Sequence, residues 1–171
     1  MRKGKILNGA LNEAIDCMGH GDIMIIADAG LPIPQNIAKR VDLAITMDYP
    51  DVITILELVI EDFIYEKCLV AEEQKLYNPV MFNRVSSLID RCQVETVPHA
   101  QIRESLRNKA RVMVRTGSFM PWGNVVLYSG IDAPMWFKKE GVIIPEYYKE
   151  RAGYKDKLNY INVCDDIKTS K

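Results

Sequence analysis

The chain has 171 residues and a formal net charge of -1, and 48% of its residues are hydrophobic and 26% charged. This length and composition suit one globular domain with a buried core. The small net charge and the lack of a sustained basic run argue against nucleic acid and anionic membranes as partners. No apolar run reaches the roughly 18 residues that a membrane span needs, and we expect a cytoplasmic protein.

Helices and strands are predicted to alternate along most of the chain. Apolar residues repeat every three to four positions in the helical segments, and β-branched residues are common in the short apolar runs between them. The expected helices cover residues 8–19, 51–66, 78–92 and 98–107. The expected strands cover residues 23–27, 41–46, 67–71, 94–97, 110–115 and 124–128. This alternation predicts an α/β fold, a single-domain sandwich whose central sheet is largely parallel or mixed and is flanked by helices.

The sequence changes character after Pro134. Residues 135–171 contain Trp136 and four of the eight tyrosines, and their pattern predicts only one short helix, near residues 146–151. We therefore divide the chain into a domain of residues 1–134 and an aromatic-rich C-terminal extension of residues 135–171. The extension is expected to wrap the domain or a neighbouring subunit, with disorder at residues 168–171.

Residues 18–34 form the most distinctive stretch, because polar residues stand on both sides of a short apolar strand. Gly19 is expected to cap the first helix, and His20 follows it between two glycines. Asp28 stands at the other side of the strand and enters a loop rich in glycine and proline. In α/β proteins, ligands bind outside the ends of the strands. His20 and Asp28 are therefore candidates for a ligand site.

Each candidate also has an ordinary structural interpretation. The ring of His20 can close the end of a helix, and Asp28 can accept a hydrogen bond from the turn that follows it. The glycines beside His20 favour a functional role, because they leave its ring open to a ligand. His99 and Arg103 are one helical turn apart, on a face that is either solvated or part of a site. Trp122 lies in a Gly/Pro loop before a strand, where an aromatic ring either fills the core or stacks on a sugar.

Several common chemistries have no support in the sequence. Gly19 and Gly21 end a predicted helix and lack the third glycine of a dinucleotide-binding fingerprint. Neither a phosphate-binding loop nor a serine-hydrolase motif is present, and the two histidines are too far apart in sequence for a recognisable metal motif. The cysteines form no C-x-x-C pair and are expected to be buried free thiols of a reducing compartment. They are Cys17, Cys68, Cys92 and Cys164.

Three blocks of the sequence resemble the ribose pyranase and fucose mutarotase family. They are residues 19–22 (Gly-His-Gly-Asp), 26–34 (Ile-Ala-Asp-Ala-Gly-Leu-Pro-Ile-Pro) and 115–124 (Arg-Thr-Gly-Ser-Phe-Met-Pro-Trp-Gly-Asn). The resemblance runs from Lys3 to Ile131, and the second block is more similar to the pyranase branch. It implies an isomerase that interconverts the ring forms or anomers of a free monosaccharide, without a metal or organic cofactor. It also implies a homo-oligomeric ring of subunits, commonly a decamer.

The resemblance assigns roles to the candidate residues. His20 matches the family's acid/base histidine, and a histidine can both accept and donate a proton near neutral pH. The positions that match sugar-binding residues are Asp28, His99, Arg103, Trp122 and Asn124. Arg103 stands where the pyranases tend to have lysine, and Trp122 where the family usually has tyrosine. Because an indole cannot act as an acid or base near neutral pH, His20 or His99 must then carry any proton transfer.

Two alternatives to an isomerase stay open. The substitution at Trp122 and the extension are compatible with a non-catalytic sugar-binding or regulatory member of the same family. The other alternative is a structural oligomer whose polar strand ends are capped internally. The sequence alone leaves open which sugar is bound and which of the two ring reactions is catalysed.

The spacing of His20 and Asp28 sets a geometric condition for any shared site. The five strand residues between the two polar groups span about 17 Å. If both residues contact one small sugar within a subunit, the chain must fold back, or the strand must begin or end elsewhere. Otherwise the two residues must come from adjacent subunits. We therefore predict a site completed either by a fold-back or by oligomerisation.

Overall fold

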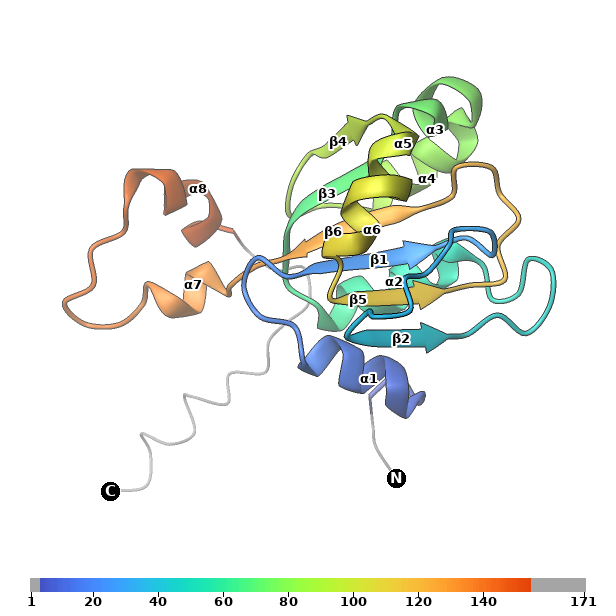
Figure 1. The fold of residues 1–171 in the computed structure, drawn as a ribbon. Coiled ribbons are helices and arrows are strands. Elements are labelled where there is room, and N and C mark those ends of the chain that lie inside the picture. Colours follow the sequence, from blue (N-terminus) through green and yellow to red (C-terminus); the bar gives the residue numbers. More distant parts are fainter. Residues whose placement is uncertain (1–3, 155–171) are drawn as a thin grey trace. The chain divides into compact units, whose positions relative to one another are not determined.

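A computed structural model describes residues 4–154 of the chain (Figure 1). Cys164 and residues 168–171, for which we predict disorder, lie outside the described residues. The chain divides into two compact units between Ile131 and Asp132. The first unit is an α/β sandwich with helices on both faces of one sheet, so the predicted fold class is confirmed.

The first unit is built on a six-stranded sheet with the strand order β2-β5-β1-β6-β3-β4. Three neighbouring pairs are parallel: β1 with β5, β5 with β2, and β3 with β4. Strand β6 is antiparallel to both of its neighbours, β1 and β3, so the sheet is mixed. The strands are β1 Ile23–Ala27, β2 Lys39–Asp42, β3 Tyr65–Ala71, β4 Val94–Val97, β5 Val112–Arg115 and β6 Val125–Ser129.

Two apolar clusters, one on each face of the sheet, join it to the helices. Alternate residues of β1 enter different clusters, and all five are buried, as expected of a central strand. One cluster contains residues of α1, α2 and α4, and the other contains residues of η1. The helical segments of this unit are α1 Gly9–Asp16, α2 Val52–Asp62, α3 Glu72–Tyr77, α4 Pro79–Leu88, α5 His99–Gln101, the π-helical η1 Ile102–Leu106 and α6 Arg107–Lys109.

Three helices begin where the sequence places capping residues. The side chains of Asn8, Asp51 and Asn78 each accept a hydrogen bond from the backbone N–H three residues later. Pro79 occupies the first position of α4, where its missing N–H costs nothing. These starts are confirmed, whereas several predicted ends are wrong.

The first helix ends earlier than predicted, and Gly19 is not its cap. Helix α1 stops at Asp16 with Cys17 as its C-cap, and the N–H of Cys17 donates to the carbonyl of Glu13. The N–H of Gly19 instead donates to the Asp22 carboxylate at 2.8 Å. Gly19 therefore belongs to the turn that carries His20, because the Asp22 side chain draws its backbone into that turn.

The second helix also ends early, and the next strand begins earlier than predicted. Helix α2 stops at Asp62 rather than Glu66, since Phe63 adopts an extended conformation. Strand β3 starts at Tyr65, which pairs with Ser129 of β6. Pairing with a central strand thus overrides the helical spacing of these residues, and it moves Glu66 from a helix end into the sheet.

Other boundaries shift for similar reasons. The predicted strand at 41–46 is shorter in the structure, because β5 ends at Arg115, opposite Asp42, and leaves nothing further to pair with. Helix α4 stops before 92 because Ile89 is extended and the next residue bonds to the Tyr65 hydroxyl. The helical segment predicted to end at 107 continues to Lys109, so β5 begins at Val112. Helix α3 was not predicted, although it follows β3 directly.

The described part of the second unit contains three short helical segments. The helix expected at 146–151 corresponds to a 3-10 turn, η2 Glu146–Tyr148, followed by α8 Lys149–Ala152. A further helix, α7 Ala133–Trp136, is capped by the Asp132 side chain, which accepts from the N–H of Met135. The unit is rich in aromatic contacts: the ring of Tyr148 lies 5.2 Å from Phe137 and 5.0 Å from Tyr147.

Candidate active site

The strand directions place the candidate residues at two opposite ends of the sheet. Strands β1 to β5 all run in one direction, and β6 runs against them. The residues that follow β1 to β5 and precede β6 form one end, named here the Asp28 end. The residues that precede β1 and follow β6 form the other, the His20 end. Asp28, Trp122, Asn124 and His99 flank strands at the first end, and His20 precedes β1 at the second.

Asp28 and Asn124 form a closed pair at the Asp28 end. The N–H of Asp28 donates to the Asn124 side-chain oxygen at 3.0 Å, and the Asn124 amide donates back to Oδ2 of Asp28 at 2.8 Å. Asn124 is 1% exposed, whereas Asp28 is half-buried and reaches the surface. The structure thus brings together two residues that are 96 positions apart in sequence.

Asp28 also has the ordinary structural role expected of an aspartate before glycine. Its Oδ1 accepts hydrogen bonds from the N–H groups of Gly30 at 3.0 Å and Leu31 at 2.8 Å. The carboxylate is therefore fixed by three donors while it faces a hollow of about 260 Å³. A carboxylate offers about four acceptor positions, so one stays available for a sugar hydroxyl. The hollow is lined by residues 28–30 and 118–121.

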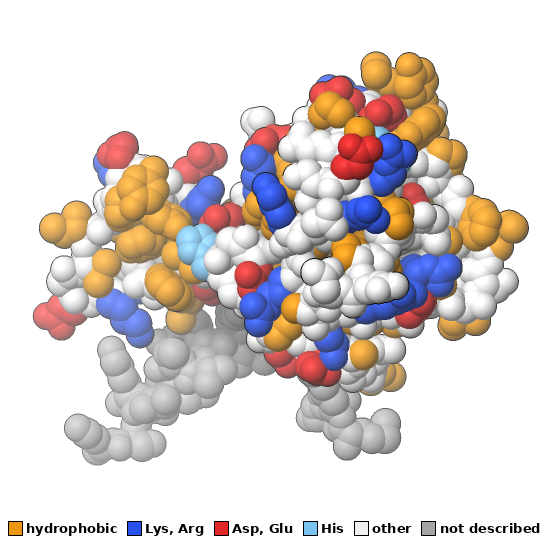
Figure 2. Space-filling view, viewed as in Figure 1, with side chains coloured by type: hydrophobic (Ala, Val, Ile, Leu, Met, Phe, Trp, Pro, Cys, Tyr) orange, Lys and Arg blue, Asp and Glu red, His pale blue; other side chains and the backbone are white. Residues whose placement is uncertain are grey.

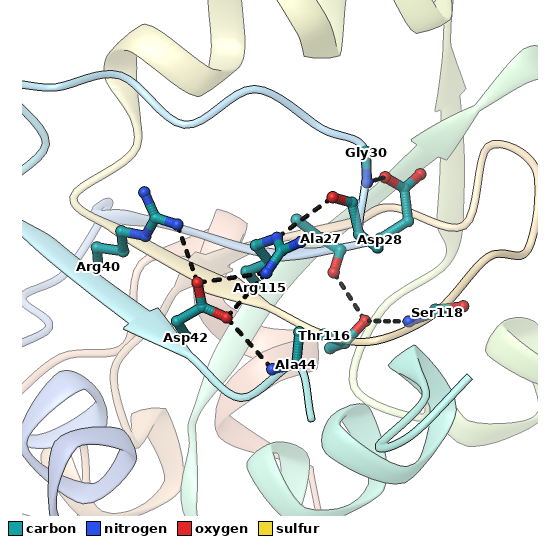
Figure 3. A network of polar contacts seen from close by, with 10 residues as sticks. Ala27, Asp28, Gly30, Arg40, Asp42, Ala44, Arg115, Thr116 and Ser118 are labelled. Atoms are coloured by element: carbon teal, nitrogen blue, oxygen red, sulfur yellow. Dashed lines mark hydrogen bonds and ion pairs between the residues drawn. The ribbon is translucent and has the colours of Figure 1, made fainter. Parts of the chain in front are cut away.

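A buried polar network supports the backbone around Asp28 (Figure 3). Thr116 is fully buried, and its hydroxyl donates to the Ala27 carbonyl at 2.9 Å and accepts from the N–H of Ser118. The N–H of Ala29 in turn donates to the Ser118 carbonyl. The Arg115 guanidinium reaches across to the Ala29 carbonyl at 3.2 Å. These bonds hold the two loops that line the hollow against each other.

Asp42 anchors the guanidinium of Arg115 at the edge of this network (Figure 3). Arg115 contacts the Asp42 carboxylate at 3.2 Å, Arg40 contacts it at 2.9 Å, and the N–H of Ala44 also donates to it. Partial burial raises the pKa of Asp42, but these three hydrogen bonds and the charge of Arg115 outweigh it. The pKa of Asp42 is consequently lower than the ordinary value of 3.8.

The loop that carries Trp122 is held by helices α3 and α4. The Trp122 carbonyl accepts from the buried Gln74 amide at 2.7 Å, and the Pro121 carbonyl accepts from Asn78 at 3.0 Å. The Trp122 backbone has a φ of 54°, a conformation that is uncommon for a residue other than glycine. Its ring is half-buried and lies 5.5 Å from the ring of Tyr77. Trp122 thus packs on α3, and sequence reasoning missed that helix.

His99 and Arg103 lie on the helical segment that follows β4. The N–H of His99 donates to Glu73 at 2.9 Å, and Arg103 pairs with Glu104 at 2.6 Å. Among residues 4–154, neither side chain bonds to Asp28 or Asn124. The helical segment that carries them packs over β1 and over the loop after Asp28, because Ile102 and Leu106 share an apolar cluster with Ala27 and Leu31. His99 therefore lies at the same end of the sheet as Asp28 without a hydrogen bond to it.

His20 lies at the opposite end of β1 from Asp28, so the chain does not fold back. The N–H of Gly21 donates to the Ser129 carbonyl, the N–H of Ser129 donates to the Asp22 carbonyl, and both distances are 2.8 Å. Gly21 has a φ of 84°, which favours glycine at this turn. The fold-back that we considered from the sequence is excluded. Within one subunit, His20 and Asp28 therefore lie at opposite ends of β1.

Glu66 lies at the His20 end of the sheet, and the sequence analysis did not identify it as a site residue. The Nε2 atom of His20 lies 3.1 Å from Oε1 of Glu66. The His20 side chain is 45% exposed and that of Glu66 21% exposed. Glu66 was assigned to a helix that in fact ends at Asp62, and its place opposite the end of β6 follows only from the sheet pairing. No local signal in the sequence would have identified it.

The described residues show few features of metal or membrane binding. Among residues 4–154, no three His, Cys, Asp or Glu side chains are grouped so that they could hold a metal ion. None of the helices in residues 4–154 is both long enough and apolar enough to cross a membrane. Cys68 is a buried free thiol, as predicted, whereas Cys17 is free but only half-buried. Burial raises the pKa of the Cys68 thiol, which keeps it unreactive. On the face shown in Figure 2, basic and acidic side chains of the first unit are mixed.

Comparison with known proteins gives a consistent result for the sequence. Residues 1–132 match the RbsD / FucU transport protein family. D-ribose pyranase 2 of Rubrobacter xylanophilus is 42% identical over 153 residues, which cover 90% of this chain and 99% of that protein. D-ribose pyranase 1 of Streptomyces griseus is 39% identical over 151 residues, which cover 88% and 99%. These matches are longer than the first unit, so the similarity continues into the extension.

Solved structures share the fold. Bacillus subtilis RbsD complexed with D-ribose matches with a TM-score of 0.72 and 30% sequence identity, over 77% of this chain and 98% of that chain. FucU from Bifidobacterium longum matches with a TM-score of 0.62 over 74% of this chain and 97% of that chain. Its sequence identity is 20%, so this second likeness concerns the fold alone.

Proposed function

The chain belongs to the RbsD / FucU transport protein family, and we propose that it is an isomerase that interconverts the ring forms of free D-ribose. Two relatives that are 42% and 39% identical are named D-ribose pyranases, and the B. subtilis relative was solved with D-ribose. The second sequence block, which contains Asp28, also resembles the pyranase branch rather than the mutarotase branch. The reaction therefore exchanges the pyranose and furanose rings of the sugar.

The closed pair of Asp28 and Asn124 beside a hollow is the observation that carries this proposal. The pair presents a fixed carboxylate to the hollow, and a carboxylate with a spare acceptor position suits a sugar hydroxyl. Trp122, His99 and Arg103 complete the sugar-binding set at the same end of the sheet. Orientation by several such contacts lowers the barrier without covalent chemistry.

His20 supplies the proton transfers in this proposal. Opening of the pyranose requires that a proton leave the anomeric hydroxyl and that one reach the ring oxygen, while the bond between that oxygen and the anomeric carbon breaks. Closure through another hydroxyl reverses these steps. An exposed imidazole can accept and return the proton near neutral pH. The substitution of tyrosine by Trp122 leaves this role with the histidines.

We place His20 and Asp28 of one site in adjacent subunits of a homo-oligomeric ring, commonly a decamer in this family. The geometry supports this arrangement because β1 holds the two residues at opposite ends of the sheet. Apolar side chains of the loop before α2 are also exposed, with Ile45 76%, Met47 64% and Tyr49 61% accessible. Such exposed apolar groups are typical of surfaces that another subunit covers. Size-exclusion chromatography with light scattering measures the number of subunits directly.

A cytoplasmic location is part of the same proposal. Cys17 and Cys68 are free thiols in the structure, as is usual for proteins of a reducing compartment. Alkylation of the thiols in unbroken cells, followed by mass spectrometry, tests this point. A disulfide in the isolated native protein would contradict it.

Saturation-exchange NMR with D-ribose tests the activity. The wild-type protein should accelerate exchange between the pyranose and furanose signals, and His20→Ala should reduce the acceleration about 10²- to 10⁴-fold. D-ribose binding, measured by calorimetry, should survive in that variant and should be lost in Asp28→Ala. Binding without acceleration by the wild-type protein would instead identify a non-catalytic sugar-binding member. Acceleration of L-fucose anomer exchange alone would assign the chain to the mutarotase reaction.

A further inference from the structure

We propose that Glu66 is a positioning residue that holds the His20 ring so that its Nδ1 atom, and not Nε2, faces the sugar. This inference rests on the proposed function, because it specifies how His20 performs the proton transfers. The evidence is a hydrogen-bond geometry, a local distortion of the sheet and a glycine that makes room for the Glu66 side chain.

The contact between the two side chains defines the state of the ring. Oε1 of Glu66 lies 3.1 Å from Nε2 of His20, and an ionised carboxylate can only accept a hydrogen bond. In the neutral ring, Nε2 must therefore carry the proton and Nδ1 must be the basic nitrogen. Among residues 4–154, Nδ1 of His20 has no hydrogen-bond partner. It is the nitrogen that stays available to a ligand.

The sheet directs Glu66 towards His20 through an irregularity at this residue. The pairing of β3 with β6 shifts register between Tyr65 and Lys67, so Glu66 stands at a bulge. Bulges change the direction in which a side chain points and are common beside active sites. The turn that carries His20 is attached to β6, the strand that pairs with β3 at the bulge. Gly21 donates a backbone hydrogen bond to Ser129, the last residue of β6, and Asp22 accepts one from it.

Gly130 provides the space that the Glu66 side chain needs. A Cβ atom at this position would lie 3.1 Å from Cβ, 3.3 Å from the backbone nitrogen and 3.4 Å from Cγ of Glu66. The first two separations are shorter than ordinary van der Waals contacts. The N–H of Gly130 also donates to the Ile64 carbonyl at 2.9 Å, which fixes the backbone just before the bulge. The end of β6 is thus shaped to accept Glu66 in its position beside His20.

The arrangement fits the needs of a proton shuttle. Nδ1 takes the proton of the anomeric hydroxyl while the carbonyl of the open-chain sugar forms and the ring bond breaks, and the same proton then passes to the released ring oxygen. During this step the ring is an imidazolium, and the carboxylate on Nε2 stabilises its charge and keeps its orientation. A carboxylate has the same relation to the histidine of the serine protease triad.

The exposure of His20 distinguishes a positioning role of Glu66 from a role in stabilising the fold. The His20 side chain is 45% exposed, and partly exposed ion pairs contribute little to folding because water screens them. An exposed ring without a partner samples several rotamers and both neutral tautomers. The loss of Glu66 should therefore change catalysis and leave the free energy of unfolding nearly unchanged.

The test compares Glu66→Gln and Glu66→Ala with the matched control Glu95→Gln, all in the full-length oligomer. Glu95 belongs to the neighbouring strand β4, where it pairs with Lys67 at 3.0 Å, and among the described residues it forms no hydrogen bond or ion pair with His20 or His99. We expect kcat for D-ribose to fall about tenfold in Glu66→Gln, which keeps an acceptor but no charge, and about 10²-fold in Glu66→Ala. KM should be unchanged in both, and Glu95→Gln should behave as wild type.

Ring nitrogen chemical shifts of His20 provide a readout that does not depend on turnover. The chain has two histidines, so the signal missing from His20→Ala identifies the ring. Wild type should show the tautomer protonated at Nε2, and Glu66→Ala should show a mixture. Wild-type kcat and wild-type shifts in both Glu66 variants would overturn the inference while the proposed function stands. Absence of any acceleration by the wild-type protein would instead overturn the proposed function itself.

Discussion

The two ends of the sheet are built in different ways. At the Asp28 end, buried polar groups bond to one another: Thr116, Ser118 and Asn124 are each at most 1% exposed. At the His20 end, backbone hydrogen bonds anchor the turn, but the His20 side chain is 45% exposed and has one bonding partner among the described residues. The polar side chains at the Asp28 end are therefore held by several hydrogen bonds, whereas the His20 side chain is held by one.

This difference corresponds to a division between binding and chemistry. A sugar has several hydroxyls at fixed angles, so the residues that bind it must be held in place, and the network around Asp28 does this. The residue that transfers protons must reach different oxygens as the ring opens and closes. A partly exposed histidine whose ring is oriented by one carboxylate can meet those oxygens at its unbonded ring nitrogen. The comparison predicts that substitutions at the Asp28 end reduce stability and that substitutions at the His20 end reduce turnover.

The largest effect on stability is expected for Gly117→Ala. A Cβ atom there would overlap the Thr46 carbonyl oxygen and lie 2.6 Å from that of Tyr49, and neither backbone atom can move alone. We expect the free energy of unfolding to fall by about 3 kcal/mol or more. The matched control at the His20 end is Gly19→Ala, whose Cβ would meet only the Asp22 carboxylate at 3.4 Å. Urea unfolding at one protein concentration measures both, and equal losses would contradict the proposed contrast.

Asn124→Ala should have the next largest effect. It removes both hydrogen bonds to Asp28 and leaves a half-buried N–H group without its acceptor, so we expect a loss of about 2–3 kcal/mol in the free energy of unfolding. D-ribose binding should weaken as well, because the Asp28 carboxylate loses a fixed orientation. His20→Ala should cost less than about 0.5 kcal/mol. Calorimetry and urea unfolding of both variants decide whether the ends differ as described.

The sequence predicted the Asp28 end better than the His20 end. The hydrophobic spacing located β1 and the start of β6 near Asn124, and the capping residues Asp51 and Asn78 gave the starts of two helices. These features depend on neighbouring residues, so a local pattern records them. The pairing of Asp28 with Asn124, in contrast, joins positions far apart in sequence, and only the family resemblance placed both at one site.

The parts that the sequence did not reveal depend on the sheet. Glu66 was assigned to the end of a helix because its neighbours continue a helical spacing, yet pairing of Tyr65 with Ser129 places it in β3. Helix α3 was missed because its six residues carry little apolar periodicity; only Gln74 is buried, and its amide bonds to Trp122. Both errors concern interactions between distant segments, and neither has a signature in the local sequence.

A smaller effect is expected from the titration of Asp42 at the Asp28 end. Its pKa is lowered in the folded protein, so its contribution to stability is present above the ordinary value of 3.8 and is lost as the pH falls through the lower folded value. Because its side chain is 38% exposed, this contribution should be below about 1 kcal/mol. Asp42→Asn should therefore reduce the slope of stability against pH below about pH 4, where the unfolded chain takes up this proton before the folded protein does. An unchanged slope would show that Arg115 is held without this charge.

The smallest effect, and the most selective, is expected from Gly130→Ala at the His20 end. The added methyl group would press on Cβ and the backbone nitrogen of Glu66, which must then give way by a few tenths of an ångström. The free energy of unfolding should change by less than about 1 kcal/mol, whereas kcat for D-ribose should fall about two- to fivefold because the His20 ring loses its alignment. The double variant Gly130→Ala/Glu66→Ala tests whether the added methyl group lowers kcat through Glu66. If Gly130 acts through Glu66, the double variant should be no slower than Glu66→Ala alone, and a further fall in kcat would mean that the methyl group disturbs His20 by another route.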